Sequence, residues 1–217
     1  MSYPLVIKDN FFPYPESILE SCNQLDCDSS YPNWPGLRTC CFSGINKKLF
    51  LFISNRIFAL IHDKEPDHYN MNISFQKIKP YVKDDKWDKK NRGWVHKDCC
   101  LFGGVIYLDK NPDKDAGTGI YDLKDGYHFQ NEESLYYKKL LHSGKLTDDG
   151  QYYQAYDMIA DQYEETLRVP NVYNRLVLMP GDQMHGMTTI GDKERNTIVF
   201  FCNEAIGVYP PEYRSLN

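Results

Sequence analysis

Residues 94–98, Trp94-Val95-His96-Lys97-Asp98, mark the point where the chain changes from helical patterns to short apolar runs. The runs that follow are separated by turns rich in Gly, Asp and Pro. The strands expected from this pattern are residues 94–98, 101–108, 119–123, 175–179 and 197–202. Many short strands with such turns are typical of a sandwich or jelly roll. The sequence therefore predicts a mainly β fold with flanking helices.

The length of 217 residues suits a single domain over residues 1–217. We expect a helical N-terminal support over about residues 1–70 and a core over about residues 71–205. A polar, tyrosine-rich insertion interrupts that core over about residues 124–170. The domain should therefore combine an α-helical start with a β-rich remainder.

Helical spacing of apolar residues predicts three helices, and alternation predicts one further strand. The helices begin at Pro15, cover residues 46–61 and cover residues 152–167. The last of these places Tyr152, Tyr156, Ile159, Tyr163 and Leu167 on one face. Residues 72–78 alternate like a half-buried strand.

Bulk composition excludes several classes of protein. The 41% apolar and 25% charged fractions are ordinary for a globular protein, and no segment is long and apolar enough for a membrane span. The seven cysteines form no Cys-x-x-Cys motif, so we expect reduced thiols and a cytoplasmic protein. The net charge of −5 argues against general nucleic-acid binding. The oligomeric state stays open.

Charge is unevenly distributed along the chain. Residues 77–97 carry eight basic residues against three aspartates, whereas residues 109–165 carry thirteen acidic residues against six lysines. Two solvated faces would explain this distribution. A basic rim that attracts an anionic substrate is the functional alternative.

His96, Asp98 and His185 are candidate metal ligands. Side chains at i and i+2 of an extended strand leave the same face, so His96 and Asp98 can bind one ion together. His185 follows a distant apolar run and can complete a set of two histidines and one carboxylate. Such a set leaves coordination positions open, as a non-haem Fe(II) oxygenase requires. A zinc hydrolase-like site is a weaker alternative, because Arg195 would have no obvious task in it.

The order of these motifs resembles the Fe(II)/2-oxoglutarate-dependent oxygenases, in particular the prolyl-4-hydroxylase-like branch, over about residues 94–202. The matching pieces are His96-Lys97-Asp98, Tyr107-Leu108-Asp109, Gly117-Thr118-Gly119, His185, and Arg195 ten residues after it. The resemblance implies a double-stranded β-helix, a jelly roll of the cupin-like type.

The resemblance also implies a role for each residue. His96, Asp98 and His185 would hold Fe(II) as the catalytic centre, with 2-oxoglutarate and O2 as cosubstrates. Arg195 would bind the far carboxylate of 2-oxoglutarate through its bidentate fork. The hydroxyl groups of Tyr107 and Thr197 are candidate donors to the same carboxylate, with simple strand packing as the alternative.

The implied activity is that of a dioxygenase that hydroxylates an unactivated C–H bond and releases succinate and CO2. The substrate would be a peptide or a small molecule, with nucleic acid unlikely and no membrane partner. The alternative from another class is a catalytically inactive jelly-roll binding or structural protein with a vestigial metal site. A decayed site would be expected to lack a ligand or Arg195, and all four residues are present.

Overall fold

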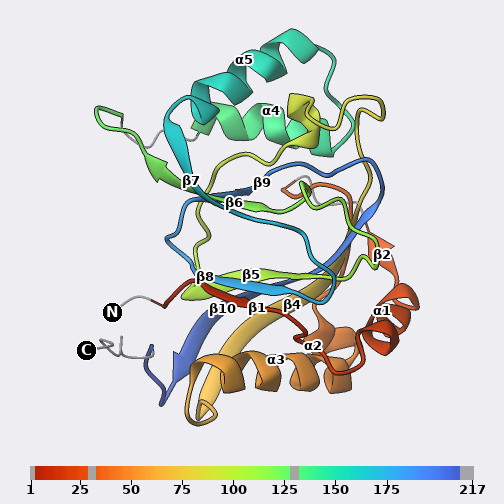
Figure 1. Cartoon of the computed structure of the whole chain (residues 1–217), viewed down its shortest axis with the longest axis vertical. Coiled ribbons are helices and arrows are strands. Elements are labelled where there is room, and N and C mark those ends of the chain that lie inside the picture. Colours follow the sequence, from red (N-terminus) through yellow and green to blue (C-terminus); the bar gives the residue numbers. More distant parts are fainter. Residues whose placement is uncertain (1–2, 29–32, 128–131, 211–217) are drawn as a thin grey trace.

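The computed structural model describes residues 3–28, 33–127 and 132–210, and it consists of two facing β-sheets with helices on both outer sides (Figure 1). The larger sheet has seven strands in the order β1-β8-β5-β10-β4-β3-β2, and the smaller has three in the order β7-β6-β9. All the recorded strand pairings are antiparallel. This arrangement confirms the predicted jelly roll.

The strands of the larger sheet come from both halves of the chain. They are β1 (Val6–Lys8), β2 (Cys27–Asp28), β3 (Leu37–Thr39), β4 (His68–Ile78), β5 (Phe102–Tyr107), β8 (Leu176–Pro180) and β10 (Arg195–Ile206). The smaller sheet contains β6 (Thr118–Leu123), β7 (Tyr163–Val169) and β9 (His185–Met187). The N-terminal support thus adds three strands to the larger sheet besides its helices.

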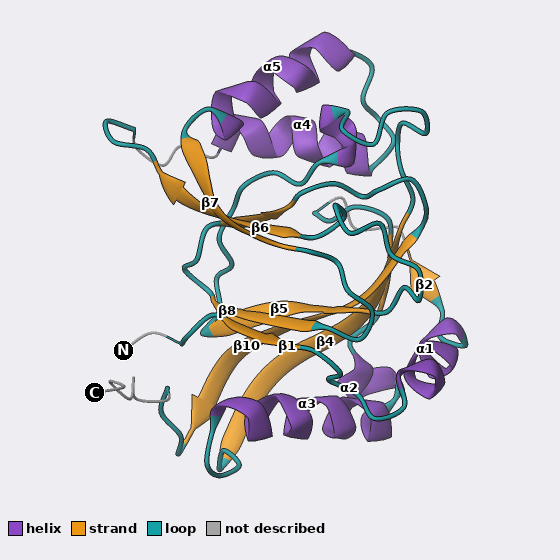
Figure 2. Ribbon diagram, in the orientation of Figure 1, coloured by secondary structure: helices purple, strands orange, loops and turns teal. Residues whose placement is uncertain are grey.

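Helices α1 (Pro15–Asn23), α2 (Phe42–Ile45) and α3 (Lys47–Ile61) cover the outer side of the larger sheet (Figure 2). Helix α3 begins after Asn46, whose side chain accepts a hydrogen bond from the backbone N–H of Leu49 at 3.1 Å. Such a cap satisfies a donor that the first turn would leave unpaired. The apolar stripe of α3, with Ile53 and Ile57, packs in the main core with the sheet.

Helices α4 (Glu132–His142) and α5 (Asp149–Ala160) lie beyond the smaller sheet, on the opposite side of the molecule (Figure 1). Tyr152 and Tyr156 of α5 are buried in a second core with Trp94. A short 3-10 helix, η1 (Lys89–Asn91), contacts α5. Helices α4 and α5 therefore form a layer of their own over the smaller sheet, whereas the end of the insertion, residues 163–169, joins that sheet as β7.

Side chains alternate along β4 and β10 between the helical core and the space between the sheets. Ile73 and Phe75 of β4 face the core with α3, whereas Ser74 and Gln76 line a cavity between the sheets. The same alternation occurs in β10. There Ile198 and Phe200 are core residues, and Thr197, Val199 and Phe201 line the cavity. The period of two in a strand dictates this division.

The structure confirms most of the predicted elements. Expected strands correspond to β4, β5, β6, β8 and β10, with β4 and β10 longer than predicted, and the helix over residues 46–61 corresponds to α3. Residues 94–98 are not a regular strand, because His96 forms only an isolated bridge, to His185. The predicted strand there is wrong in that respect.

The predicted helix over residues 152–167 is wrong beyond Ala160. Residues Tyr163–Val169 form strand β7, which pairs with β6. The exposed backbone edge of β6 supplies hydrogen-bond partners that a continued helix would leave unused. Leu167 is consequently 42% exposed and takes no part in the core that Tyr152 enters.

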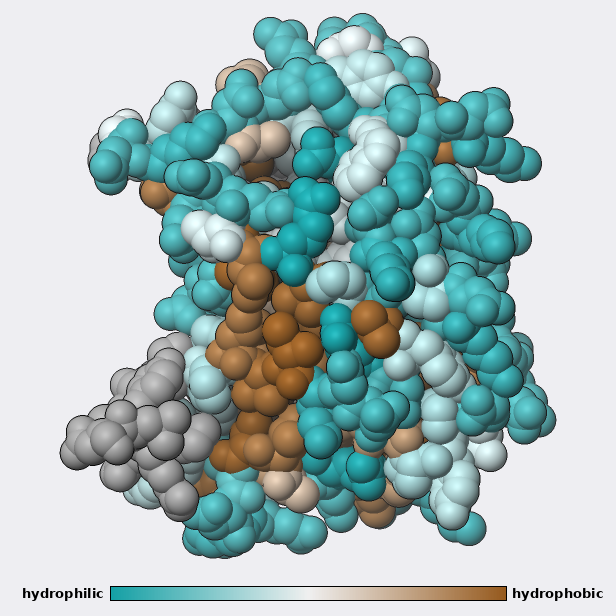
Figure 3. Space-filling model, in the orientation of Figure 1, coloured by the Kyte–Doolittle hydropathy of each residue, from teal (hydrophilic) through white to brown (hydrophobic). Residues whose placement is uncertain are grey.

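An apolar band passes over the ends of β8, β5 and β10 in the face seen in Figure 3, with polar side chains around it. All seven cysteines are free thiols. Among the helices that the structure describes, none is long and apolar enough to cross a membrane.

Candidate metal centre

Two backbone segments that are far apart in the sequence bring the predicted ligands together. The N–H of His96 donates to the carbonyl oxygen of His185 at 2.9 Å, and the N–H of His185 donates to the carbonyl of His96 at 2.8 Å. Nearby, the N–H of Asp98 donates to the carbonyl of Gly181 at 2.8 Å. The backbone, rather than a regular strand, therefore fixes the His-x-Asp segment beside the second histidine.

The side chains of His96, Asp98 and His185 converge on one point. Each offers one potential ligand atom, and these atoms all lie within 4.8 Å of one another. The Nε2 of His185 is 3.4 Å from one carboxylate oxygen of Asp98, and the Nε2 of His96 is 3.8 Å from the other. None of these three side chains is fully buried, so an ion bound between them would remain accessible from the cavity.

Hydrogen bonds orient both imidazole rings. The Nδ1 of His96 lies 2.8 Å from the carbonyl oxygen of Trp94, and the Nδ1 of His185 lies 2.9 Å from that of Gln183. A carbonyl oxygen only accepts, so each Nδ1 carries the hydrogen and each Nε2 keeps its lone pair. Burial, His185 and Lys138 all lower the pKa of His96, which favours the neutral, ligating form.

Trp94, two residues before His96, supports the centre from the helical side. It is only 5% exposed, and its indole N–H donates to the hydroxyl of Tyr152 at 3.0 Å. Its ring meets those of Tyr152 and Tyr156 edge to face. The helical insertion is thereby packed directly against the segment that carries His96.

The three candidate ligands border a cavity of about 730 Å³ between the two sheets. Arg195 and Thr197, from the start of β10, border the same cavity. Five of the residues singled out from the sequence thus meet in one place. A volume of this size is within the range of pockets that hold a small molecule.

Arg195 is buried without an anionic partner among the described residues. It is 6% exposed, and its Nε has no hydrogen-bond partner. Its guanidinium carbon lies 5.3 Å from the centre of the Tyr107 ring. Burial lowers the pKa of Arg195, although Tyr107 and Asp109 oppose this effect. A buried cation with one unsatisfied donor fits an anionic ligand in the adjoining cavity.

Tyr107 and Thr197 differ in their access to the cavity. The hydroxyl of Tyr107, which is fully buried, is 2.7 Å from Oγ1 of Thr118, and Thr118 borders the cavity while Tyr107 lies behind it. Thr197 borders the cavity directly. Direct contact of either hydroxyl with a cosubstrate stays a prediction.

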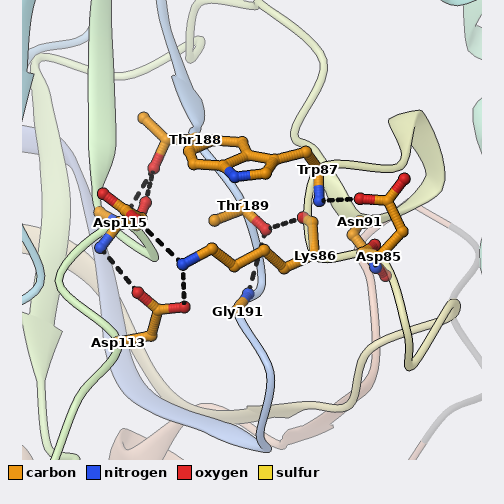
Figure 4. A network of polar contacts seen from close by, with 10 residues as sticks. Asp85, Lys86, Trp87, Asn91, Asp113, Asp115, Thr188, Thr189 and Gly191 are labelled. Carbon is orange, nitrogen blue, oxygen red and sulfur yellow. Dashed lines mark hydrogen bonds and ion pairs between the residues drawn. The ribbon is translucent and has the colours of Figure 1, made fainter.

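Three lysines of residues 77–97 pair with aspartates of residues 109–165. Figure 4 shows Lys86, whose Nζ lies 3.0 Å from Asp113 and 2.9 Å from Asp115. Thr189 also donates to the carbonyl of Lys86, which ties this loop to the segment after β9. Further along, Lys89 pairs with Asp157 and Lys90 with Asp149, both on α5. These three lysines are therefore not a free basic rim.

Sequence reasoning missed two cations at this cavity, Arg38 of β3 and Lys138 of α4. Neither belongs to a motif, and each lies far along the chain from His96. Only the fold places them at the cavity, so no local signal could have identified them.

Comparison with solved structures finds many similar chains, three of which illustrate the result. HygX from Streptomyces hygroscopicus, with nickel and 2-oxoglutarate bound, matches with a TM-score of 0.56 and 12% identity, over 93% of this chain and 83% of that one. SnoN, a non-heme alpha ketoglutarate dependent epimerase from nogalamycin biosynthesis, matches with a TM-score of 0.52 and 11% identity, over 97% and 82% of the two chains. A prolyl 4-hydroxylase from Phytophthora capsici matches with a TM-score of 0.50 and 12% identity, over 93% and 59%.

Comparison with protein-family models and with curated protein sequences finds no match. At identities near 12%, the structural similarities establish the fold and leave the chemistry to be argued from the site itself. The fold implied by the sequence resemblance is confirmed: the chain has the jelly-roll fold of the 2-oxoglutarate-dependent oxygenases, prolyl 4-hydroxylases among them.

Proposed function

We propose that this protein is an Fe(II)- and 2-oxoglutarate-dependent oxygenase that hydroxylates an unactivated C–H bond of a small molecule or peptide. One observation carries the proposal. The side chains of His96, Asp98 and His185 converge at the cavity that Arg195 also borders, and the buried Nε of this arginine has no hydrogen-bond partner. A metal ion would bind the two histidines and the aspartate, and a dianionic chelator of that ion would place its second carboxylate at Arg195.

The chemical types of these residues suit Fe(II) and 2-oxoglutarate. Two neutral imidazoles and one carboxylate suit Fe(II) and leave positions for other ligands. The bonds to the carbonyl oxygens of Trp94 and Gln183 would hold both rings with Nε2 toward the ion. Arg195 would receive the far carboxylate of 2-oxoglutarate, with Thr197 as an additional donor. When bound, Fe(II) with 2-oxoglutarate and O2 supplies an oxidant able to hydroxylate such a bond, with release of succinate and CO2.

The similar structures support this proposal through the kinds of ligand that they bind. HygX has been captured with nickel, 2-oxoglutarate and hygromycin B bound, at a TM-score of 0.53 to this chain. The same fold therefore accommodates a small-molecule ligand together with a metal and 2-oxoglutarate. SnoN is described as an epimerase, so hydroxylation is one outcome among those that this fold supports.

The competing proposal is a catalytically inactive binding or structural protein with a vestigial site. Such a protein has no requirement to keep three ligands and a buried arginine together. The retained ligand set and the hydrogen-bonded Nδ1 atoms of both histidines favour the enzyme.

The decisive experiment is titration of 2-oxoglutarate into the Fe(II)-loaded protein without oxygen. Chelation of Fe(II) by a 2-oxo acid produces a metal-to-ligand charge-transfer band, and we expect that band to appear and saturate. Admission of O2 should then convert 2-oxoglutarate to succinate, measured by mass spectrometry. Absence of the band contradicts the oxygenase, and a band without succinate formation, even with a substrate library, supports the inactive protein.

A further inference from the structure

Arg38 and Lys138 reach the cavity from opposite layers of the molecule. Arg38 belongs to β3, which lies between β4 and the edge strand β2 of the larger sheet. Lys138 belongs to α4, beyond the smaller sheet (Figure 1). The carboxylate of Asp98 acts electrostatically on both cations. Two cations from separate elements therefore face the region of the candidate metal centre.

Arg38 is held in place but keeps an unused donor. Its Nη2 donates to Oε1 of Gln76 at 3.0 Å, and its guanidinium carbon lies 4.2 Å from the centre of the Trp34 ring. Its Nε is buried and has no hydrogen-bond partner. Burial lowers the pKa of Arg38 to about 10, so the group stays charged at neutral pH. A fixed, charged guanidinium with an unpartnered Nε donor is suited to an oxyanion.

Lys138 has no hydrogen bond or ion pair with any residue that the structure describes. Burial lowers its pKa, and Asp98 opposes that effect. The next residue of α4, Lys139, is exposed and does not border the cavity. The helix thus directs one of two consecutive lysines to the cavity and the other to solvent.

The charge balance of the cavity leaves these cations uncompensated. The described residues that border it include two carboxylates and five cations, namely Asp28, Asp98, Arg38, Lys90, Arg92, Lys138 and Arg195. Lys90 is paired with Asp149, and Arg195 is the proposed partner of 2-oxoglutarate. Fe(II), Asp98, Arg195 and a 2-oxoglutarate dianion are together neutral. Arg38, Arg92 and Lys138 then exceed the one remaining carboxylate, Asp28.

We infer that the primary substrate carries an oxyanion group, a carboxylate or a phosphate, that Arg38 and Lys138 bind together. This inference rests on the proposed function, because it assigns Arg195 to the cosubstrate and leaves the other cations to the substrate. The two cations that it assigns to the substrate lie outside residues 77–97.

Trp34 offers a direct readout, because its ring stacks on the guanidinium that would bind the anion. Inorganic phosphate and acetate are titrated separately, without oxygen, into protein saturated with Fe(II) and 2-oxoglutarate, and tryptophan fluorescence is followed. The same titrations are repeated on metal-free protein. We expect saturable binding of at least one anion, and the tighter of the two identifies the preferred group.

Arg38→Gln and Lys138→Gln should each weaken binding of that anion about tenfold, since a charge-assisted hydrogen bond contributes on this order. Lys139→Gln is the matched control and should bind like the wild type. The inference is overturned if the wild-type protein binds neither anion, if either cavity variant binds as well as the wild type, or if Lys139→Gln weakens binding equally. The charge-transfer band reports the proposed function separately, and the metal-free titrations report the anion site even if that band never forms.

Discussion

His96 and His185 are joined through their backbones by two hydrogen bonds, at 2.9 and 2.8 Å. The distance between the two candidate ligands therefore does not depend on their side chains. Removal of one imidazole or of the Asp98 carboxylate should leave the two segments aligned. Because backbone hydrogen bonds and not the ligand side chains align the two segments, metal binding can be tested by substitution without unfolding the protein.

Asp98→Ala and His185→Ala should each reduce Fe(II) content strongly, by at least about tenfold, because loss of a ligand removes more affinity than the 10–100-fold cost of losing a supporting contact. Elemental analysis after desalting measures the loss, and circular dichroism checks the fold. His68→Ala, at an exposed position on β4, is the control and should load like the wild type. Unchanged iron in both ligand variants would refute the assignment.

Arg195→Lys keeps a positive charge but loses the bidentate fork, so it should raise the Kd for 2-oxoglutarate. Arg195→Ala should raise it further, by about a hundredfold, since a hydrogen bond between charged groups contributes on the order of 1.5–3 kcal/mol. Fe(II) content should be unchanged in both variants. The charge-transfer titration measures these affinities. Wild-type affinity in Arg195→Ala would remove this residue from the cosubstrate site.

Gly93→Ala should disturb the metal centre through the backbone. The Gly93 N–H donates to the carbonyl of Met187 at 2.7 Å, and a Cβ on residue 93 would lie 2.5 Å from the Met187 backbone nitrogen. The resulting displacement should cost about 1–3 kcal/mol of unfolding free energy, as overpacking commonly does.

The metal should also bind less tightly to Gly93→Ala, because His96 and His185 lie on the displaced segments. Urea denaturation and iron titration measure the two effects. Gly44→Ala is the matched control, since a Cβ there meets nothing within 4 Å. A Gly93→Ala protein as stable as the control would show that the pairing tolerates the methyl group.

Lys86→Met should destabilise the protein by about 1–3 kcal/mol, the range for a buried hydrogen-bond partner left unsatisfied. The reason is Asp113, whose side chain is 20% exposed and would lose the ammonium 3.0 Å away. Lys83→Met, an exposed lysine of the same stretch, should change stability little. Urea denaturation compares the two, and equal stabilities would show that the ion pairs in Figure 4 contribute nothing measurable.

The candidate site could be predicted from sequence because its members lie in a fixed order on neighbouring segments of a known fold. His96, Asp98, His185 and Arg195 are recognisable by residue type and spacing, and the structure brings them to one cavity. The roles of Tyr107 and Thr197 stay predictions, since a strand position alone does not reveal which groups a hydroxyl meets.

Other features depend on tertiary contacts that no local pattern contains. The apolar spacing from Tyr152 continues through Tyr163 as it would in a single helix. Residues Tyr163–Val169 nevertheless form a strand, because they pair with β6. Arg38 and Lys138 lie in segments whose sequence gives no hint that they face the same space. Complementary charge stretches likewise do not disclose that Lys89 and Lys90 pair with α5.

The alternation along β4 and β10 separates two kinds of position. Substitutions at Ser74, Gln76 and Val199 alter the shape and polarity of the cavity, whereas Ile73 and Phe200 contribute to the core with α3. A substitution at one position should therefore change what the cavity binds, whereas a substitution at the next should change the thermodynamic stability. A library that varies only the cavity-facing positions of these two strands should retain folded members at high frequency while diversifying what they bind.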